Sequence, residues 1–160
     1  MPQYLTFTLG GETFAMGILG IKEIIEYADL TDVPMMPACV RGVINLRGSV
    51  VPVIDLAVRF GKPPTSVTRR TCIVIAEIAV GTDRQVAGVV VDAVNAVIEI
   101  PAEEIEPPPT FGLHIQTDLI HGMGKVNGRF VILLDVEHVL ATQDLQLMTA
   151  SLGDQAAAAA

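Results

Sequence analysis

The stretch Val40–Leu56, which reads VRGVINLRGSVVPVIDL, predicts a β-hairpin that leads into a short helix. Two runs rich in Val and Ile, Gly42–Leu46 and Ser49–Ile54, flank the dipeptide Arg47-Gly48, which suits a tight two-residue turn. Asp55 follows the second run, where its carboxylate can accept hydrogen bonds from the first free N–H groups of a helix. This stretch is therefore a compact β-unit with a capped helix at its end.

The same pattern recurs 80 residues later. Both copies read glycine, strand, Gly-containing turn, apolar strand, Asp and short helix. The matched positions are Gly42 and Gly122, Gly48 and Gly128, Val51 and Val131, Ile54 and Leu134, Asp55 and Asp135, and Leu56 and Val136. Matches in the same structural roles predict two related β-units. Short strands joined by tight turns favour two small barrels over open sheets, because closure removes exposed edges.

Short Val- and Ile-rich runs broken by Gly and Pro predict β-structure along the rest of the chain. Further strands are predicted at Tyr4–Leu9, Thr13–Ile18, Arg70–Ala79, Gln85–Val91, Val94–Ile100, Leu119–Val126 and Arg129–Leu134. Lys22–Tyr27 fits one helical face, but its β-branched cluster favours a strand. Helical segments are predicted at Ala38–Arg41 (one turn), Leu56–Phe60 and Glu137–Ala150, and a polar, Pro-rich linker is predicted at Lys62–Thr68.

Composition excludes several classes of protein. The 160 residues include 10 Lys and Arg against 18 Asp and Glu, for a net charge of −8, and contain no Trp. Sequence-reading DNA or RNA proteins need basic surfaces, so we predict no nucleic-acid partner. Neither a signal peptide nor an apolar run of membrane-spanning length is visible, which predicts a cytoplasmic protein without membrane insertion. Cys39 and Cys72 lie in apolar sequence and are predicted to be buried, reduced thiols.

A search for catalytic chemistry finds no set of residues that fits. The three histidines, His114, His121 and His138, lack metal-ligand spacing. Three glycines, Gly122, Gly124 and Gly128, straddle a predicted hairpin and are not followed by the Lys-Ser/Thr of a phosphate-binding loop. No nucleophile, base and acid stand out together, so we predict no enzyme activity, no cofactor and no metal site.

Two charged residues do stand out. Glu23 lies inside an apolar segment, and Arg47 lies at the tip of the predicted hairpin. They are either two unrelated surface charges, an ion pair that braces the hairpin, or a charged rim to an apolar groove. A surface ion pair contributes only about 0–1 kcal/mol, so such a pair would serve orientation more than stability.

With these residues in view, the chain resembles the CheW family of bacterial chemotaxis coupling proteins. The resemblance runs from about Gln3 to Leu147, and its most specific piece is the stretch Val40–Leu56 quoted above. Supporting pieces are Tyr4–Gly17 (YLTFTLGGETFAMG), Ile21–Ile25 (IKEII), Gly88–Val94 (GVVVDAV) and Gly122–Asp135.

The resemblance implies an all-β fold of two small five-stranded SH3-like β-barrels packed on a shared hydrophobic core, with short helices and a C-terminal helix. It implies one CheW-like domain over residues 1–152, followed by a disordered tail, 153–160. We expect the first barrel to span about residues 15–66 and the second to combine about 3–14 with 67–141, since the first strand of the family crosses over into the second barrel.

The resemblance also implies a non-catalytic adaptor at receptor arrays under the inner membrane. Its expected partners are the helical cytoplasmic tip of a chemoreceptor, the regulatory domain of the chemotaxis histidine kinase CheA, and further copies of itself in rings. The positions that match the receptor groove are Ile18, Ile21, Glu23, Gly42, Arg47, Gly48, Val94 and Val97. The kinase-facing positions are Leu30, Thr31 and Val33, and Phe111 is the expected ring contact.

Three alternatives remain at this point. A coupling module of a pilus or surface-sensing pathway would have the same sequence pattern. A small-molecule or nucleic-acid-binding barrel would need a different surface, with basic and aromatic residues interleaved in the nucleic-acid case. An enzyme is disfavoured because no catalytic set is visible.

Overall fold

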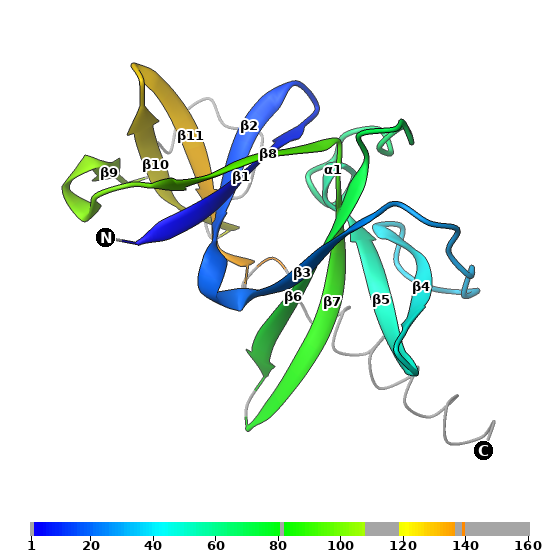
Figure 1. Cartoon of the computed structure of the whole chain (residues 1–160). Helices are drawn as coiled ribbons and strands as arrows, with labels where there is room; N and C mark the ends of the chain where they lie inside the picture. The colour runs from blue at the N-terminus through cyan, green and yellow to red at the C-terminus, as the bar shows by residue number, and fades with distance from the viewer. Residues whose placement is uncertain (1, 81, 108–118, 137–138, 140–160) are drawn as a thin grey trace.

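The computed structural model describes residues 2–80, 82–107, 119–136 and 139. Within them the chain forms mostly strands and one short α-helix (Figure 1). The elements in chain order are β1 (Gln3–Leu9), β2 (Glu12–Gly17), the 3-10 turn η1 (Ile18–Gly20), β3 (Ile21–Glu26), β4 (Val40–Leu46), β5 (Ser49–Asp55), α1 (Leu56–Arg59), β6 (Cys72–Val80), β7 (Asp83–Val91), β8 (Ala93–Glu99), the 3-10 turn η2 (Ala102–Glu104), β9 (Ile105–Glu106), β10 (Ile120–Val126) and β11 (Arg129–Leu134). The predicted all-β class is confirmed.

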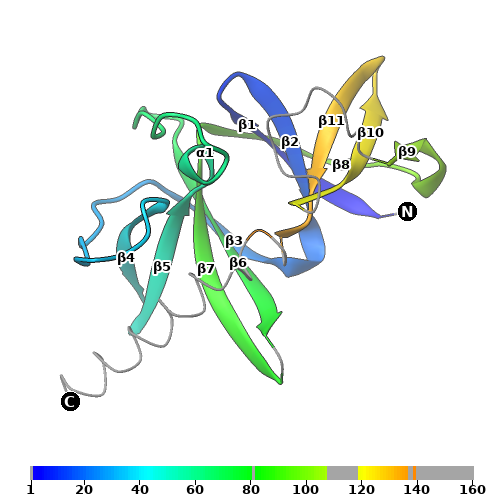
Figure 2. The same ribbon diagram turned by 180° about the vertical axis from the view of Figure 1, so that it is seen from behind.

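The strands make two sheets, seen from opposite sides in Figures 1 and 2. The first sheet has the order β3-β6-β7-β5-β4, and the second has the order β8-β1-β2-β11-β10-β9. The first strand, β1, lies in the second sheet, between β8 and β2. The predicted division of the other strands is wrong, because β2 stays with β1 in the second sheet, and β6 and β7 belong to the first. Lys62–Thr68 consequently joins two strands of one sheet and is no boundary between units.

Tight turns define the predicted hairpins. In Gly10-Gly11, Arg47-Gly48 and Asn127-Gly128, both residues have positive φ, between 51° and 86°. Two residues with positive φ give the turn whose twist matches that of paired strands. Lys22–Tyr27 is confirmed as a strand. The helical turn predicted at Ala38–Arg41 is wrong, because Val40 already begins β4 and only a tight turn precedes it, closed by the bond from Val40 N to Pro37 O. The predicted helix at Glu137–Ala150 and the tail at 153–160 lie outside the described residues.

The five strands of the first sheet and five of the six strands of the second sheet share one topology. In both, an edge strand (β3 or β8) pairs with a hairpin (β6–β7 or β1–β2). This hairpin pairs in parallel with the second strand (β5 or β11) of another hairpin, β4–β5 or β10–β11. The hairpins β4–β5 and β10–β11 match residue for residue at the 80-residue offset, including the register shift after their first pair. The edge strands match at an offset of 73 residues, since Ile21 pairs with Ala76 as Val94 pairs with Phe7.

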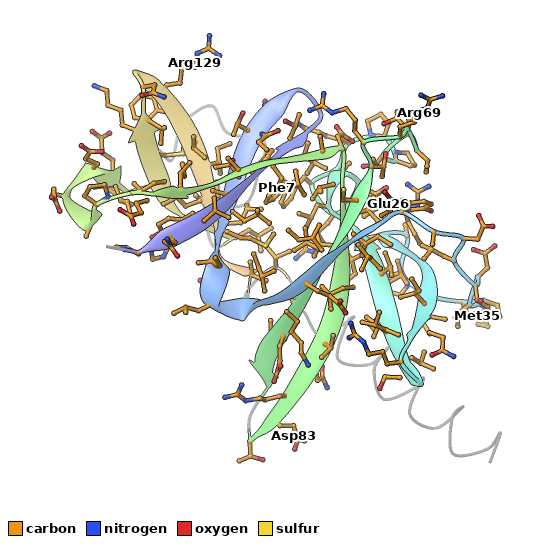
Figure 3. All side chains as sticks on the ribbon, in the orientation of Figure 1. Phe7, Glu26, Met35, Arg69, Asp83 and Arg129 are labelled. Atoms are coloured by element: carbon orange, nitrogen blue, oxygen red, sulfur yellow. The ribbon has the colours of Figure 1, made fainter. Side chains whose placement is uncertain are left out.

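Many strands carry apolar residues on both faces because each sheet packs against an apolar cluster on either side. The inner face of each sheet surrounds its own cluster, around Val53 and Ile75 in the first sheet and around Tyr4 and Leu133 in the second. The opposite faces meet in a shared core that contains Phe7 (Figure 3). The shared core holds equivalent residues from both sheets: Leu5 and Val74, Leu9 and Ile78, Met16 and Val89, and Leu134 and Ile54. Contact through the same face on both sides is the arrangement of a twofold-symmetric dimer.

Each sheet curls, and the chain returns from one edge to the other. After β3, Thr31 exchanges two backbone hydrogen bonds with Val43 of β4, and after β8, Glu106 pairs with Met123 of β10. Gly42 and Gly122 lie beside these crossings, where an added Cβ would stand 2.6 Å from the Thr31 oxygen and 2.9 Å from the Glu106 oxygen. Over the described residues, β3 and β4 share no direct ladder, so each unit is an SH3-like curled sheet whose edges meet only at these points.

Candidate functional site

Glu23 and Arg47 form the ion pair that the sequence suggested. The guanidinium donates two parallel hydrogen bonds, from Nη1 to Oε1 at 2.9 Å and from Nη2 to Oε2 at 2.8 Å. Arg47 occupies the hairpin turn with a φ of 52°, and the turn is closed by Gly48 N donating to Asn45 Oδ1 at 2.9 Å. A forked pair of this kind fixes the direction of both side chains.

The pair connects the two edges of the first sheet. Glu23 lies on β3 and Arg47 lies on the turn that ends β4, and these strands are opposite edges of the sheet. The side chain of Glu23 is 26% exposed and that of Arg47 is 75% exposed. Hydrogen bonds from Arg47 hold the pKa of Glu23 below its usual value of 4.5, against a smaller opposing effect of desolvation. Both groups are thus charged at neutral pH and are presented to solvent in one orientation.

The apolar positions predicted for the receptor groove lie at the margin of the shared core. Ile21 and Val94 are half-buried and pack against it, and Ile18 is half-buried in η1. Val97 is 49% exposed. Gly42 is buried at the strand crossing, so it shapes the backbone and offers no side chain to a partner.

The internal repeat makes several of these positions equivalent, with one member on β3 and the other on β8. Ile21 on β3 is equivalent to Val94 on β8, and Glu23 is equivalent to Ala96. Both edge strands lie on the side of the molecule that faces the viewer in Figure 1 and are behind in Figure 2. We call this surface the edge-strand face, made of the exposed parts of η1, β3 and β8 with Arg47.

Sequence reasoning missed two residues of the edge-strand face. Ile24 is 42% exposed and is the equivalent of Val97, because Ile24 pairs with Val74 as Val97 pairs with Leu5. Leu19 in η1 is 102% exposed. The 73-residue offset between β3 and β8 could have found Ile24, but the two strands share few identical residues.

A cleft opens between the two sheets next to this face. Its volume is about 290 Å³. Of the predicted groove residues, only Ile21 lines it, together with Tyr4, Met16, Gly17, Gly20, Ala76, Glu77, Ile78, His121, Leu134, Asp135 and Val136. The predicted receptor positions are therefore spread over two edge strands and do not converge on one pocket.

The residues predicted to face the kinase lie on the segment that crosses from β3 to β4. Thr31 is exposed and is held by its two bonds to Val43. Leu30 is half-buried against the core of the first sheet, and Val33 is half-buried against the shared core. Only part of this set is free for a partner. Phe111, the expected ring contact, lies outside the described residues.

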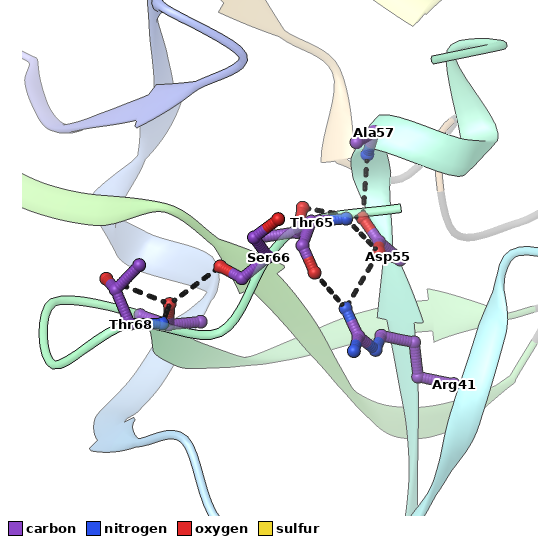
Figure 4. A network of polar contacts seen from close by, with 7 residues as sticks. Arg41, Asp55, Ala57, Thr65, Ser66 and Thr68 are labelled. Atoms are coloured by element: carbon purple, nitrogen blue, oxygen red, sulfur yellow. Dashed lines mark hydrogen bonds and ion pairs between the residues drawn. The ribbon is translucent and has the colours of Figure 1, made fainter. Parts of the chain in front are cut away.

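Asp55 caps α1 as predicted, but it does more. It is fully buried, and its carboxylate accepts bonds from Ala57 N, from Thr65 N and Oγ1, and from Arg41 Nη1 at 3.1 Å (Figure 4). Arg41 also donates to Thr65 O at 2.6 Å and lies over the ring of Tyr27, 5.4 Å from its centre. This network secures the segment after α1 and is structural.

The described residues hold no cluster of three or more His, Cys, Asp or Glu side chains that could bind a metal ion. His121 is exposed on β10, while His114 and His138 lie outside the described residues. Among the helices that the structure describes, none is long and apolar enough to cross a membrane.

Comparison with known proteins decides the family. The chain matches the CheW-like domain family over residues 3–144. This protein belongs to the CheW family. The chemotaxis protein CheW of Klebsiella aerogenes is 35% identical over 146 residues, which cover 91% of this chain and 86% of that protein. The CheW protein of Helicobacter pylori is 36% identical over 138 residues, covering 86% of this chain and 81% of that protein.

A solved CheW structure shows the same fold. The crystal structure of the scaffolding protein TtCheW from Thermoanaerobacter tengcongensis superimposes with a TM-score of 0.79 at 34% identity, over 90% of this chain and 91% of that one. The resemblance stated from the sequence and the role of chemotaxis adaptor are confirmed by these relatives. Within this CheW-family chain, the Glu23–Arg47 pair and the two edge strands form the best-defined candidate for a partner surface.

Proposed function

We propose that this chain couples the cytoplasmic tip of a chemoreceptor to the regulatory domain of the chemotaxis kinase CheA, and that the edge-strand face receives the receptor. The observation that supports it best is the forked Glu23–Arg47 pair, held in one orientation on the first sheet. The edge strands β3 and β8 also expose the apolar side chains of Ile24 and Val97. A helical receptor tip offers apolar side chains at helical spacing together with polar groups, which suit an apolar surface with a fixed charged rim.

The kinase contact belongs, in this proposal, to the exposed part of the Leu30–Val33 segment. That segment crosses β4 at its middle, because Thr31 pairs with Val43, which is four residues before Arg47 in the turn that follows Leu46. Two partners can therefore bind the first sheet at separate places. Copies of the chain in rings, and a location at receptor arrays, complete the proposal.

The test is receptor binding by an Arg47→Ala variant. We expect binding to a receptor cytoplasmic fragment to weaken by about 1–2 kcal/mol, a loss of roughly 5- to 30-fold, because the variant loses a rim cation and leaves Glu23 without its partner. Binding to the kinase regulatory domain should change little. Isothermal titration calorimetry with each partner measures both affinities.

Arg84→Ala is a closely matched control. Arg84 pairs with Glu77 at 3.3 Å, and its side chain is 79% exposed against 75% for Arg47, while Glu77 is 25% exposed against 26% for Glu23. The control removes an equally exposed arginine from the same sheet, while Glu77 keeps its second partner, Lys22, at 3.4 Å. It should leave both affinities unchanged. Equal losses for the two variants, or a loss on the kinase side alone, would show that the receptor does not bind at Arg47.

A further inference from the structure

Met35 is held outside the protein by a turn that its neighbours anchor. Its side chain is 102% exposed, and Figure 3 shows it projecting from the segment between β3 and β4. The residues on either side of the Pro34-Met35 turn behave differently, because Val33 and Met36 pack, half-buried, against the shared core. The turn is therefore fixed at both ends while the thioether of Met35 stands in water.

The backbone of Met35 is also in an unfavourable conformation. Its φ is 63°, in the left-handed region that is unfavourable for residues with a side chain and is usually taken by glycine or asparagine. An exposed apolar side chain in an unfavourable conformation adds nothing to the stability of the isolated chain. Met35 follows the Leu30–Val33 segment by two residues, so its side chain extends the surface proposed to bind the kinase.

The methionines of the described residues differ sharply in access. Met16 is 1% exposed in the shared core, and Met36 and Met123 are half-buried against it. A peroxide oxidises a thioether when a sulfur lone pair attacks one peroxide oxygen: an S–O bond forms, the O–O bond breaks, and water leaves. The sulfur is oxidised and hydrogen peroxide is reduced. Since the reagent must reach the sulfur, Met35 is expected to react first among the methionines that the structure describes.

We propose that Met35 is a site of oxidation by peroxide, and that its sulfoxide weakens binding of the kinase regulatory domain. The binding part rests on the proposed function, which places the kinase on the adjoining segment. Oxidation converts a flexible apolar side chain into a polar one, and a polar sulfoxide loses its water when it enters an apolar contact. An unbranched thioether suits such a contact because it adapts to irregular surfaces.

The first measurement is the order of oxidation. The intact protein is exposed to hydrogen peroxide for graded times, quenched and mapped by peptide mass spectrometry, which follows Met16, Met36, Met123 and the thiols of Cys39 and Cys72 at the same time. We expect the sulfoxide at Met35 before any other described methionine. Oxidation of Met36 or Met123 at the same rate would overturn the assignment of the site.

The second measurement is kinase affinity before and after oxidation, expressed as a ratio for each variant. We expect oxidation to lower the affinity of the wild type for the kinase domain about tenfold, which is typical when one apolar side chain at an interface no longer packs. Met35→Leu should keep its own affinity through the treatment, and Met36→Leu, which retains Met35, should lose affinity as the wild type does. An unchanged wild type, or an equal loss in Met35→Leu, would overturn the inference. If the untreated protein does not bind the kinase domain, the proposed function fails together with the binding part, while the oxidation order still decides the modification.

Discussion

Gly42 and Gly48 lie six residues apart in one hairpin, and they are glycine for different reasons. An added Cβ at Gly42 would stand 2.6 Å from the Thr31 backbone oxygen, whereas an added Cβ at Gly48 would meet nothing within 4 Å. Gly48 instead has a φ of 86° in the second position of the turn. Gly48 is closed to side chains by its backbone conformation alone, whereas Gly42 is closed both by the Thr31 backbone and by its own φ of 153°.

The two glycines therefore predict different losses of stability. Gly48→Val should cost about 1–3 kcal/mol, from strain at a positive φ. Gly42→Ala should cost about 2–4 kcal/mol, because the methyl group forces the Thr31 crossing away from β4. Gly17→Ala, at a φ of −60° with nothing within 4 Å, serves as the control and should stay within about 0.5 kcal/mol of the wild type. Urea unfolding measures all three, and a stable Gly42→Ala would show that the crossing is looser than described.

Glu23 carries a prediction about pH. Arg47 holds the pKa of Glu23 below 4.5, the value it takes without partners. The contribution of the pair to the free energy of unfolding is therefore complete above pH 4.5, and it is lost as the pH falls through the lower pKa of the folded state. Receptor affinity should be constant across neutral pH. NMR titration of the Glu23 carboxyl should show its pKa rising in Arg47→Ala, while the pKa of Glu77, lowered by Arg84 and Lys22, should stay unchanged.

At the scale of elements, the hairpins could be predicted from the sequence but their sheet membership could not. Dipeptides such as Asn127-Gly128 specify a turn through local backbone preference, which a single segment reveals. Assigning β6 and β7 to the first sheet needs the parallel pairing of Val53 with Gly88, a contact between distant segments that no local pattern encodes. The repeat was visible only in β4–β5 and β10–β11, since the other strands follow different offsets.

The candidate site shows the same limit. Glu23 and Arg47 were found because charges stand out in apolar sequence. Ile24 was missed because one more isoleucine in an apolar run carries no signal. Its exposure depends on how β3 lies at an edge of the sheet, which is a property of the assembled fold.

The Asp55 network predicts how firmly the segment after α1 is held. Asp55→Ala removes the acceptor of Arg41, Thr65 and Ala57 at once, so we expect a loss of about 3–5 kcal/mol, as for a buried pair broken on one side. Asp83→Ala, at the exposed first residue of β7, should change stability little. Thermal unfolding compares the two, and a mild effect of Asp55→Ala would mean that water replaces the carboxylate.

At the scale of the whole molecule, the shared core should make the two sheets unfold together. Both contribute equivalent residues to it, and the ring of Phe7 at its centre stacks on Phe14, 6.0 Å away. We expect a single unfolding transition, and Phe7→Ala should lower the free energy of unfolding by about 3–5 kcal/mol for both sheets alike. Hydrogen exchange at Val90 and Leu133, one from each inner cluster, reports on each sheet. Separate transitions would show two independent domains.

The place of β1 and β2 in the second sheet has a consequence for synthesis of the chain. The first sheet is built from residues 21–91 in one continuous run, so it can fold as soon as β7 has left the ribosome. The hairpin β1–β2 is made first, yet β11, its parallel partner, ends at Leu134, 117 residues after Gly17. At about 5–20 residues per second, the apolar hairpin waits roughly 6–23 s for that strand. The first sheet offers an apolar face to the waiting hairpin, because residues such as Val74 and Val89 later join the shared core. We therefore expect the finished first half to act as a nascent-chain template for the other.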